Sequence, residues 1–154
     1  MNEEKNIGVI GLGNPLNGDD GIGIVLIQKL EERGKSPHIS IFDAGTGGMK
    51  VLHFLKDLDK VIIIDAVDLD KEPGDFVFFN PEEVKSLKEP SGTHDSNLFE
   101  VLELSKDLGE IPDEIIIMGI QPKCTEIGED LSDEVENNLE NMLDSLEEMI
   151  SELK

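Results

Sequence analysis

The chain has 154 residues, 38% of them hydrophobic, and 35 acidic against 13 basic residues give a formal net charge of −22. This length suits one domain with a substantial core, and we expect a single domain over residues 1–154. So few basic residues disfavour nucleic acid and anionic membrane surfaces as partners, because clustered lysine and arginine bind both. No apolar run reaches the roughly 18 residues of a membrane span. A lone cysteine and an acidic start without a signal-peptide pattern favour a cytoplasmic protein.

Strand-like and helix-like patterns alternate along the chain. Apolar runs predict four strands of a mainly parallel sheet, at residues 7–12, 38–42, 61–64 and 114–120. A phenylalanine-rich segment at 75–80 predicts an edge strand. Amphipathic patterns predict helices at 20–32, 49–58 and 98–108, and a last helix from near Ser132. The alternation predicts an α/β fold: a doubly wound three-layer sandwich with a mainly parallel central sheet, an antiparallel edge strand and helices on both faces.

A glycine-rich segment, residues 11–23, connects the first predicted strand to the first predicted helix. Turns of this kind usually bind phosphate through their backbone N–H groups. Here Asp19 and Asp20 stand where phosphates would lie, so the loop favours a cation. A dinucleotide-binding domain is disfavoured for the same reason, and also because Leu16 stands where that fingerprint has its third glycine. Only Asp43, which could mimic the ribose-binding acid, favours it.

Polar residues follow the predicted strands where each one ends. In parallel sheets, ligands bind beyond these carboxyl ends, so we expect the residues to meet at one edge. They are Asp20 after the first strand, Asp43 and Thr46 after the second, Asp65 after the third and Gln121 after the last strand of the core. A histidine, His94, lies in a connection that crosses toward the same edge.

Two carboxylates and one imidazole suit a divalent transition metal and leave positions open for water or substrate. Each residue also has a structural explanation. Asp20 could be a first-turn acid that the helix dipole favours, and His94 could be a capping or loop histidine. Asp65 is harder to explain structurally, because a carboxylate that ends a buried strand is costly unless it is bonded or binds metal.

Other hydrolase patterns are missing from the sequence. It contains no His-Glu-x-x-His, no Gly-x-Ser-x-Gly and no Walker loop. Cys124 follows the last core strand, but no obvious base accompanies it, and we interpret it as a partly buried thiol.

Five segments, in this order, resemble those of the nickel–iron hydrogenase maturation endopeptidases, and the similarity covers nearly the whole chain. They are the glycine-rich loop, Asp43-Ala44-Gly45-Thr46, Ile64-Asp65-Ala66-Val67-Asp68, Thr93-His94 and Gly119-Ile120-Gln121-Pro122. The resemblance implies an enzyme that removes the C-terminal extension of a nickel–iron hydrogenase large-subunit precursor after nickel insertion.

The resemblance also implies residue roles. Asp20, Asp65 and His94 match the family's metal-contacting positions, and the turn with Asp43, Gly45 and Thr46 matches its substrate-facing loop, to which we add Gln121 as a substrate contact. Many members of the family have glutamate where this chain has Asp20, and a subgroup acting on formate-linked hydrogenases, among others, also has two aspartates there.

Our mechanistic hypothesis assigns the nickel to the precursor rather than to the enzyme. Asp20, Asp65 and His94 would recognise it, and the metal would position the scissile bond and polarise its carbonyl or a water molecule. Asp43 would help to activate the water. We expect an endopeptidase of the aspartyl type. We expect a monomer without an organic cofactor.

The competing hypothesis is a receiver-type signalling domain, phosphorylated at Asp65 beside Mg²⁺ held by Asp19 and Asp20. Two features disfavour it. The acidic pair lies beyond a glycine loop rather than at the strand end. No lysine stands at the end of the last predicted strand either, because Lys123 comes only after Pro122, beyond that strand.

Overall fold

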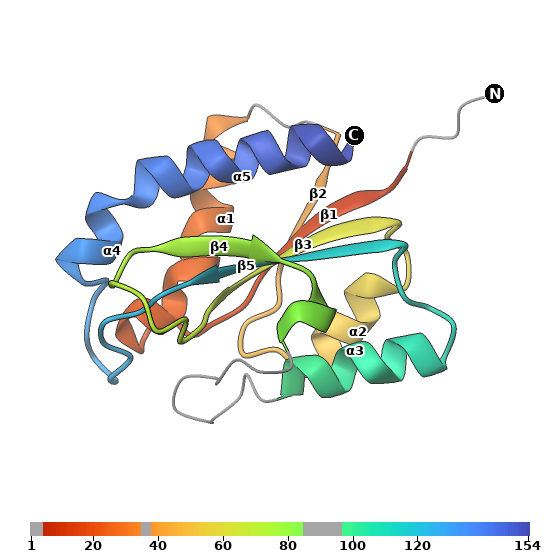
Figure 1. Ribbon diagram of the computed structural model, residues 1–154, viewed down its shortest axis with the longest axis horizontal. Coiled ribbons are helices and arrows are strands. Elements are labelled where there is room, and N and C mark those ends of the chain that lie inside the picture. The colour runs from red at the N-terminus through yellow and green to blue at the C-terminus, as the bar shows by residue number, and fades with distance from the viewer. Residues whose placement is uncertain (1–4, 35–37, 85–96) are drawn as a thin grey trace.

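The computed structural model describes residues 5–34, 38–84 and 97–154, which form a five-stranded sheet between two layers of helices (Figure 1). The strands are β1 Ile7–Gly11, β2 Ser40–Asp43, β3 Lys60–Ala66, β4 Phe76–Phe79 and β5 Glu114–Ile120. Their order across the sheet is β2-β1-β3-β5-β4. Only β4 runs antiparallel to its neighbour, at one edge. This confirms the predicted fold class.

The helices cover both faces of the sheet. They are α1 Ile22–Arg33, α2 Met49–Leu55, α3 Asn97–Asp107, α4 Asp133–Asn137 and α5 Leu139–Leu153, with short 3₁₀ turns η1 Gly18–Gly21 and η2 Pro81–Val84. Figure 1 shows α1 and α5 on one face and α2 and α3 on the other. No helix within the described ranges has the length and apolar character to cross a membrane.

Strand β3 shows why the central strands are apolar throughout. Ile62 and Ile64 belong to the core beneath α1 and α5, whereas Val61 and Ile63 belong to the core beneath α2 and α3. Successive side chains of a strand point to opposite faces, so a strand covered on both sides needs an apolar residue at every position.

The first helix begins later than the sequence predicts. Residues 18–21 form the 3₁₀ turn η1, so Asp20 precedes the α-helix, which starts at Ile22. Gly23 lies in the first turn of α1, where the helix meets the sheet, and a Cβ there would overlap the carbonyl oxygens of Leu12 and Ile64. The glycine therefore lets α1 pack directly on the backbone at the ends of β1 and β3. Strand β3 is also longer than predicted and includes Asp65.

The predicted last helix is two helices, α4 and α5, separated at Asn138. The Asn138 side chain donates a hydrogen bond to the carbonyl of Gly74 at 2.8 Å. Val135 and Leu139, on either side of the break, are both buried in the same core, so the apolar stripe continues across it. This explains why hydrophobic periodicity alone predicts one helix.

Candidate active site

The candidate site lies at the carboxyl ends of β1 and β3. The chain continues from β1 to β2 on one side, while β3 pairs with β1 on the other side, which makes this the point where the strand order reverses. Ligands of open α/β sheets bind at such a point. Gly11 of β1 pairs in register with Ile64, so Asp65 comes one residue beyond the last paired position. The turn η1, which carries Asp20, contacts β3.

Asp20 is buried, with 4% of its surface exposed. Its Oδ2 accepts a hydrogen bond from the backbone N–H of Asn14 at 3.1 Å, which holds the carboxylate against the loop that leaves β1. The tight path of this loop depends on Gly13, where φ is +133° and a Cβ would overlap the carbonyl oxygen of Asp20. The glycine-rich sequence therefore places one carboxylate at the end of β1.

Asp65 is also buried, at 2% exposed, and its Oδ1 accepts a hydrogen bond from the N–H of Ala66 at 2.9 Å. Because Ile63 and Ile64 point to opposite faces, the strand alternation directs Asp65 to the face covered by α2 and α3. We call Asp20 and Asp65 the strand-end pair.

The third predicted ligand, His94, lies outside the described residues. It precedes α3 by three positions, and α3 packs on the face toward which Asp65 points. Within the described ranges, no group of three or more His, Cys, Asp or Glu residues is placed to hold a metal ion. The three-residue nickel site therefore stays a prediction.

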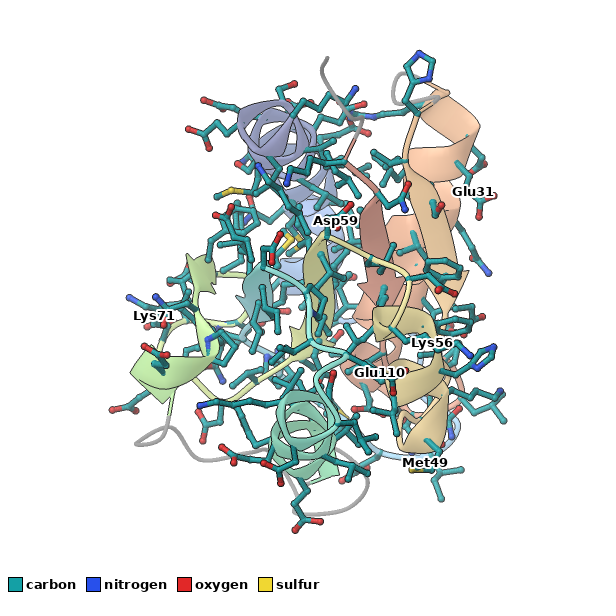
Figure 2. The ribbon with its side chains drawn as sticks, turned by 90° about the vertical axis from the view of Figure 1, so that its right-hand side faces the viewer. Glu31, Met49, Lys56, Asp59, Lys71 and Glu110 are labelled. Carbon is teal, nitrogen blue, oxygen red and sulfur yellow. The ribbon has the colours of Figure 1, made fainter. Side chains whose placement is uncertain are left out.

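The turn after β2 lies beside the glycine-rich loop. Asp43 Oδ1 accepts a hydrogen bond from the N–H of Gly45 at 2.8 Å, and the Gly45 carbonyl accepts one from the N–H of Gly13 at 2.7 Å. Thr46 is exposed, and so is Met49 at the start of α2, labelled in Figure 2. The predicted substrate-facing turn is thus attached to the loop that carries Asp20.

Gln121, at the end of β5, supports a neighbouring loop. Its Oε1 accepts hydrogen bonds from the N–H of Leu69 at 2.6 Å and of Lys71 at 3.3 Å, and its Nε2 donates to the Pro122 carbonyl at 3.3 Å. The side chain therefore braces the segment that follows β3. Its predicted contact with substrate stays a prediction.

Asp19 has a different environment from its neighbour Asp20. It is fully buried, and its carboxylate accepts four hydrogen bonds from the loop between β5 and α4. Lys123 N–H donates at 2.8 Å and Cys124 N–H at 3.2 Å, while Ser132 donates from its N–H at 2.7 Å and from its Oγ at 2.8 Å. We call these four residues the Asp19 anchor.

The anchor changes the interpretation of the acidic pair. The sequence pattern predicts that both aspartates face a cation. The Asp19 carboxylate instead accepts its hydrogen bonds from a loop more than 100 residues further along the chain. Ser132 is predicted only as the start of a helix, and its bond to Asp19 spans 113 residues. No local pattern in the sequence indicates such a contact.

An exposed ion pair also joins the loop that follows β5 to α4. Lys123 Nζ lies 2.7 Å from Glu134 Oε2. The hydrogen bond between them raises the pKa of Lys123 and lowers the pKa of Glu134.

Comparison with known proteins gives a consistent result. A family model described as hydrogenase maturation protease matches residues 24–149. The hydrogenase 2 maturation protease of Escherichia coli is 33% identical over 90% of this chain and 86% of its own length. A Methanocaldococcus jannaschii protein assigned as a hydrogenase maturation protease is 31% identical over 99% of both chains.

A solved structure agrees with these sequence relatives. The E. coli hydrogenase maturating endopeptidase HybD superposes with a TM-score of 0.84 at 29% identity, over 96% of this chain and 93% of its own. The receiver-domain alternative is not supported by these matches. The chain belongs to the hydrogenase maturation protease family and is an endopeptidase of that family.

Proposed function

We propose that this protein removes the C-terminal extension of a nickel–iron hydrogenase large-subunit precursor after nickel has been inserted. The observation that supports the location of the site is the strand-end pair, two buried carboxylates at the ends of adjacent parallel strands. The family membership supports a hydrogenase precursor as the substrate.

In this proposal the nickel is part of the substrate. Asp20 and Asp65 contribute carboxylate oxygens and His94 contributes an imidazole nitrogen, a set with no soft sulfur ligand that suits transient contact with a divalent ion. The contact positions the adjacent peptide bond, and the ion polarises its carbonyl or the attacking water.

Asp43 is the proposed base. It lies at the end of β2, next in the sheet to β1, in the turn attached to the Asp20 loop through Gly45 and Gly13. Water adds to the scissile carbonyl carbon and gives a proton to the Asp43 carboxylate. The C–N bond then breaks, and the departing amine takes the proton back from the Asp43 carboxyl, which restores the carboxylate.

We further propose that the enzyme works as a cytoplasmic monomer, without nucleic acid or membrane as a partner. The net charge of −22 supports the monomer and the absence of these partners, because a strongly acidic surface is repelled by phosphate-rich polymers, by anionic membranes and by its own copies.

The proposal is tested with two forms of the same precursor, one loaded with nickel and one free of it. Each is incubated with the enzyme and its intact mass is followed with time. We expect a C-terminal peptide to be lost from the nickel-loaded form only. Equal cleavage of both forms would remove nickel from the recognition step. Cleavage of neither form would contradict the proposed function.

The residue assignments need separate variants. Asp20→Asn and His94→Ala should both cleave nickel-loaded precursor much more slowly than the wild type while keeping its circular dichroism spectrum. Cleavage by either variant at the wild-type rate would remove that residue from the site.

A further inference from the structure

Two large hydrophobic side chains are strongly exposed beside the candidate site. Ile127 is 85% exposed and Leu16 is 71% exposed, the highest values for large hydrophobic residues in the described ranges. Leu16 lies in the loop after β1, and Ile127 lies in the loop between β5 and α4. Scattered exposed apolar residues are ordinary, but two adjacent ones near a functional site indicate a contact surface.

Backbone hydrogen bonds hold these two loops together. The N–H of Gly128 donates to the carbonyl of Leu16 at 2.7 Å, and the N–H of Gly18 donates to the carbonyl of Glu129 at 3.0 Å. The Asp19 anchor fixes the same two loops from the buried side. Leu16 and Ile127 are therefore neighbours on a preorganised surface, which lowers the ordering cost of binding a partner.

The surface is directly connected to the strand-end pair. Asn14 Oδ1 accepts a hydrogen bond from the N–H of Leu16 at 3.0 Å, and the N–H of Asn14 donates to the carboxylate of Asp20. A protein whose cleavage site reaches Asp20 would thus lie next to Leu16 and Ile127. We call these two residues the apolar docking patch.

The charges around the patch are acidic. Glu126, Glu129 and Asp130 lie in the same loop as Ile127, and all three are exposed. A partner that places an apolar side chain on the patch gains most when basic residues flank that side chain. The same charges disfavour a second copy of this chain, whose own patch carries the same acids.

We propose that Leu16 and Ile127 dock the hydrogenase large-subunit precursor itself, through a segment in which an apolar side chain is flanked by lysine or arginine. This inference rests on the proposed function, and it adds a binding surface outside the nickel-contacting residues. The patch holds the precursor while its C-terminal extension enters the site.

The test is a steady-state comparison on nickel-loaded precursor. The double variant Leu16→Ser/Ile127→Ser removes the apolar surface and leaves the backbone bonds of both loops in place. Loss of two central apolar contacts should raise KM by about tenfold, with kcat and the unfolding temperature unchanged. Glu126→Gln should raise KM by a smaller factor, and high salt should reduce the difference between Glu126→Gln and the wild type.

Leu108→Ser is the matched control. Leu108 is 54% exposed and comes directly after α3, at the end of the molecule opposite the candidate site. Figure 2 looks onto that opposite end and labels the nearby Glu110. This control should keep the wild-type KM.

Different results would overturn the docking patch alone or the docking patch together with the proposed function. Cleavage by the wild type together with an unchanged KM in the double variant would overturn the docking patch alone. A fall in kcat without a rise in KM would also overturn it, and so would a wild-type dimer that the double variant converts to monomers. A wild type that neither binds nor cleaves the precursor would overturn both proposals.

Discussion

The Asp19 anchor and the strand-end pair use buried carboxylates in opposite ways, although Asp19 and Asp20 are adjacent in the sequence. Asp19 joins segments that are far apart in the chain, since its four donors come from residues 123–132. The Asp20 and Asp65 carboxylates accept hydrogen bonds from backbone N–H groups six residues and one residue away. Each of those two bonds lies within a single segment of the chain.

This difference assigns a stabilising role to Asp19 and a functional role to the strand-end pair. A carboxylate that joins two distant segments contributes to the folded structure as a whole, so its loss should lower the free energy of unfolding. The Asp20 carboxylate is the proposed contact for the metal ion of the substrate, so its replacement by an amide of the same shape should affect cleavage first. The two neighbouring aspartates should therefore give different variant phenotypes.

The largest expected effect is on stability, in Asp19→Asn. The amide keeps one acceptor oxygen but turns an NH₂ group toward donors of the 123–132 loop, so hydrogen bonds to a buried charge are lost. We expect the free energy of unfolding to fall by about 2–4 kcal/mol, measured by urea denaturation. Ser132→Ala, which removes only the hydroxyl donor, should cost about 1 kcal/mol. An unchanged urea midpoint in Asp19→Asn would contradict the structural role of the anchor.

The opposite phenotype is expected for Asp20→Asn. Cleavage of nickel-loaded precursor should slow by about a hundredfold or more, because an amide oxygen is a weaker ligand for a divalent ion than a carboxylate. The urea midpoint should move less than in Asp19→Asn. The comparison fails if Asp20→Asn is the less stable of the two proteins and keeps full activity.

The ion pairs of Arg33 should contribute less than the anchor, because two of its three acidic partners are exposed although its own side chain is only 19% exposed. Arg33 ends α1 and bonds three acids of α5, with Nη1 at 2.9 Å from Asp144 and 2.6 Å from Glu147, and Nη2 at 2.5 Å from Glu140. Hydrogen bonds to Asp144 and Glu147 raise the pKa of Arg33 above its usual range. Arg33→Met should lower the unfolding temperature less than Asp19→Asn does, and high salt should reduce the difference from the wild type. A loss larger than that of Asp19→Asn would reverse the ranking.

The smallest expected effect is a pH dependence from Lys123 and Glu134. The pKa of Glu134 is lowered by the hydrogen bond from Lys123, so the pair stabilises the fold above the ordinary glutamate pKa. That contribution disappears as the pH falls through the lowered pKa of the folded state. Urea midpoints of the wild type and of Glu134→Gln should therefore differ slightly at neutral pH and converge in acid. A gap that widens in acid would contradict the direction of this pKa shift.

The fold class and the positions of the central strands along the chain could be predicted from the sequence pattern. Strand β5 has the predicted bounds, because an isoleucine-rich run is delimited by acids before it and by Gln121 and Pro122 after it. Asp65 is found at the end of β3 because it is the first charged residue after an apolar run. These signals are local. They predict the structure well here because a strand buried on both faces is apolar along its whole length, so polar residues mark its ends.

The remaining features depend on a backbone turn or on contacts between distant segments. The start of α1 at Ile22 depends on the 3₁₀ turn, in which the N–H of Asp20 donates to the carbonyl of Asn17. The break at Asn138 depends on its bond to Gly74, which lies 64 residues earlier. The separate role of Asp19 depends on a loop that follows β5. Composition and periodicity carry no information about these partners.

We propose that the strand-end pair, and not the neighbouring anchor, forms the peptidase site. The most direct test is the intact mass of nickel-loaded large-subunit precursor after incubation with wild-type enzyme or with Asp65→Asn of matched unfolding temperature. We predict that the wild type removes a C-terminal peptide and that Asp65→Asn leaves the precursor at full length. Removal of the same peptide by Asp65→Asn at the wild-type rate would exclude Asp65 from the peptidase site.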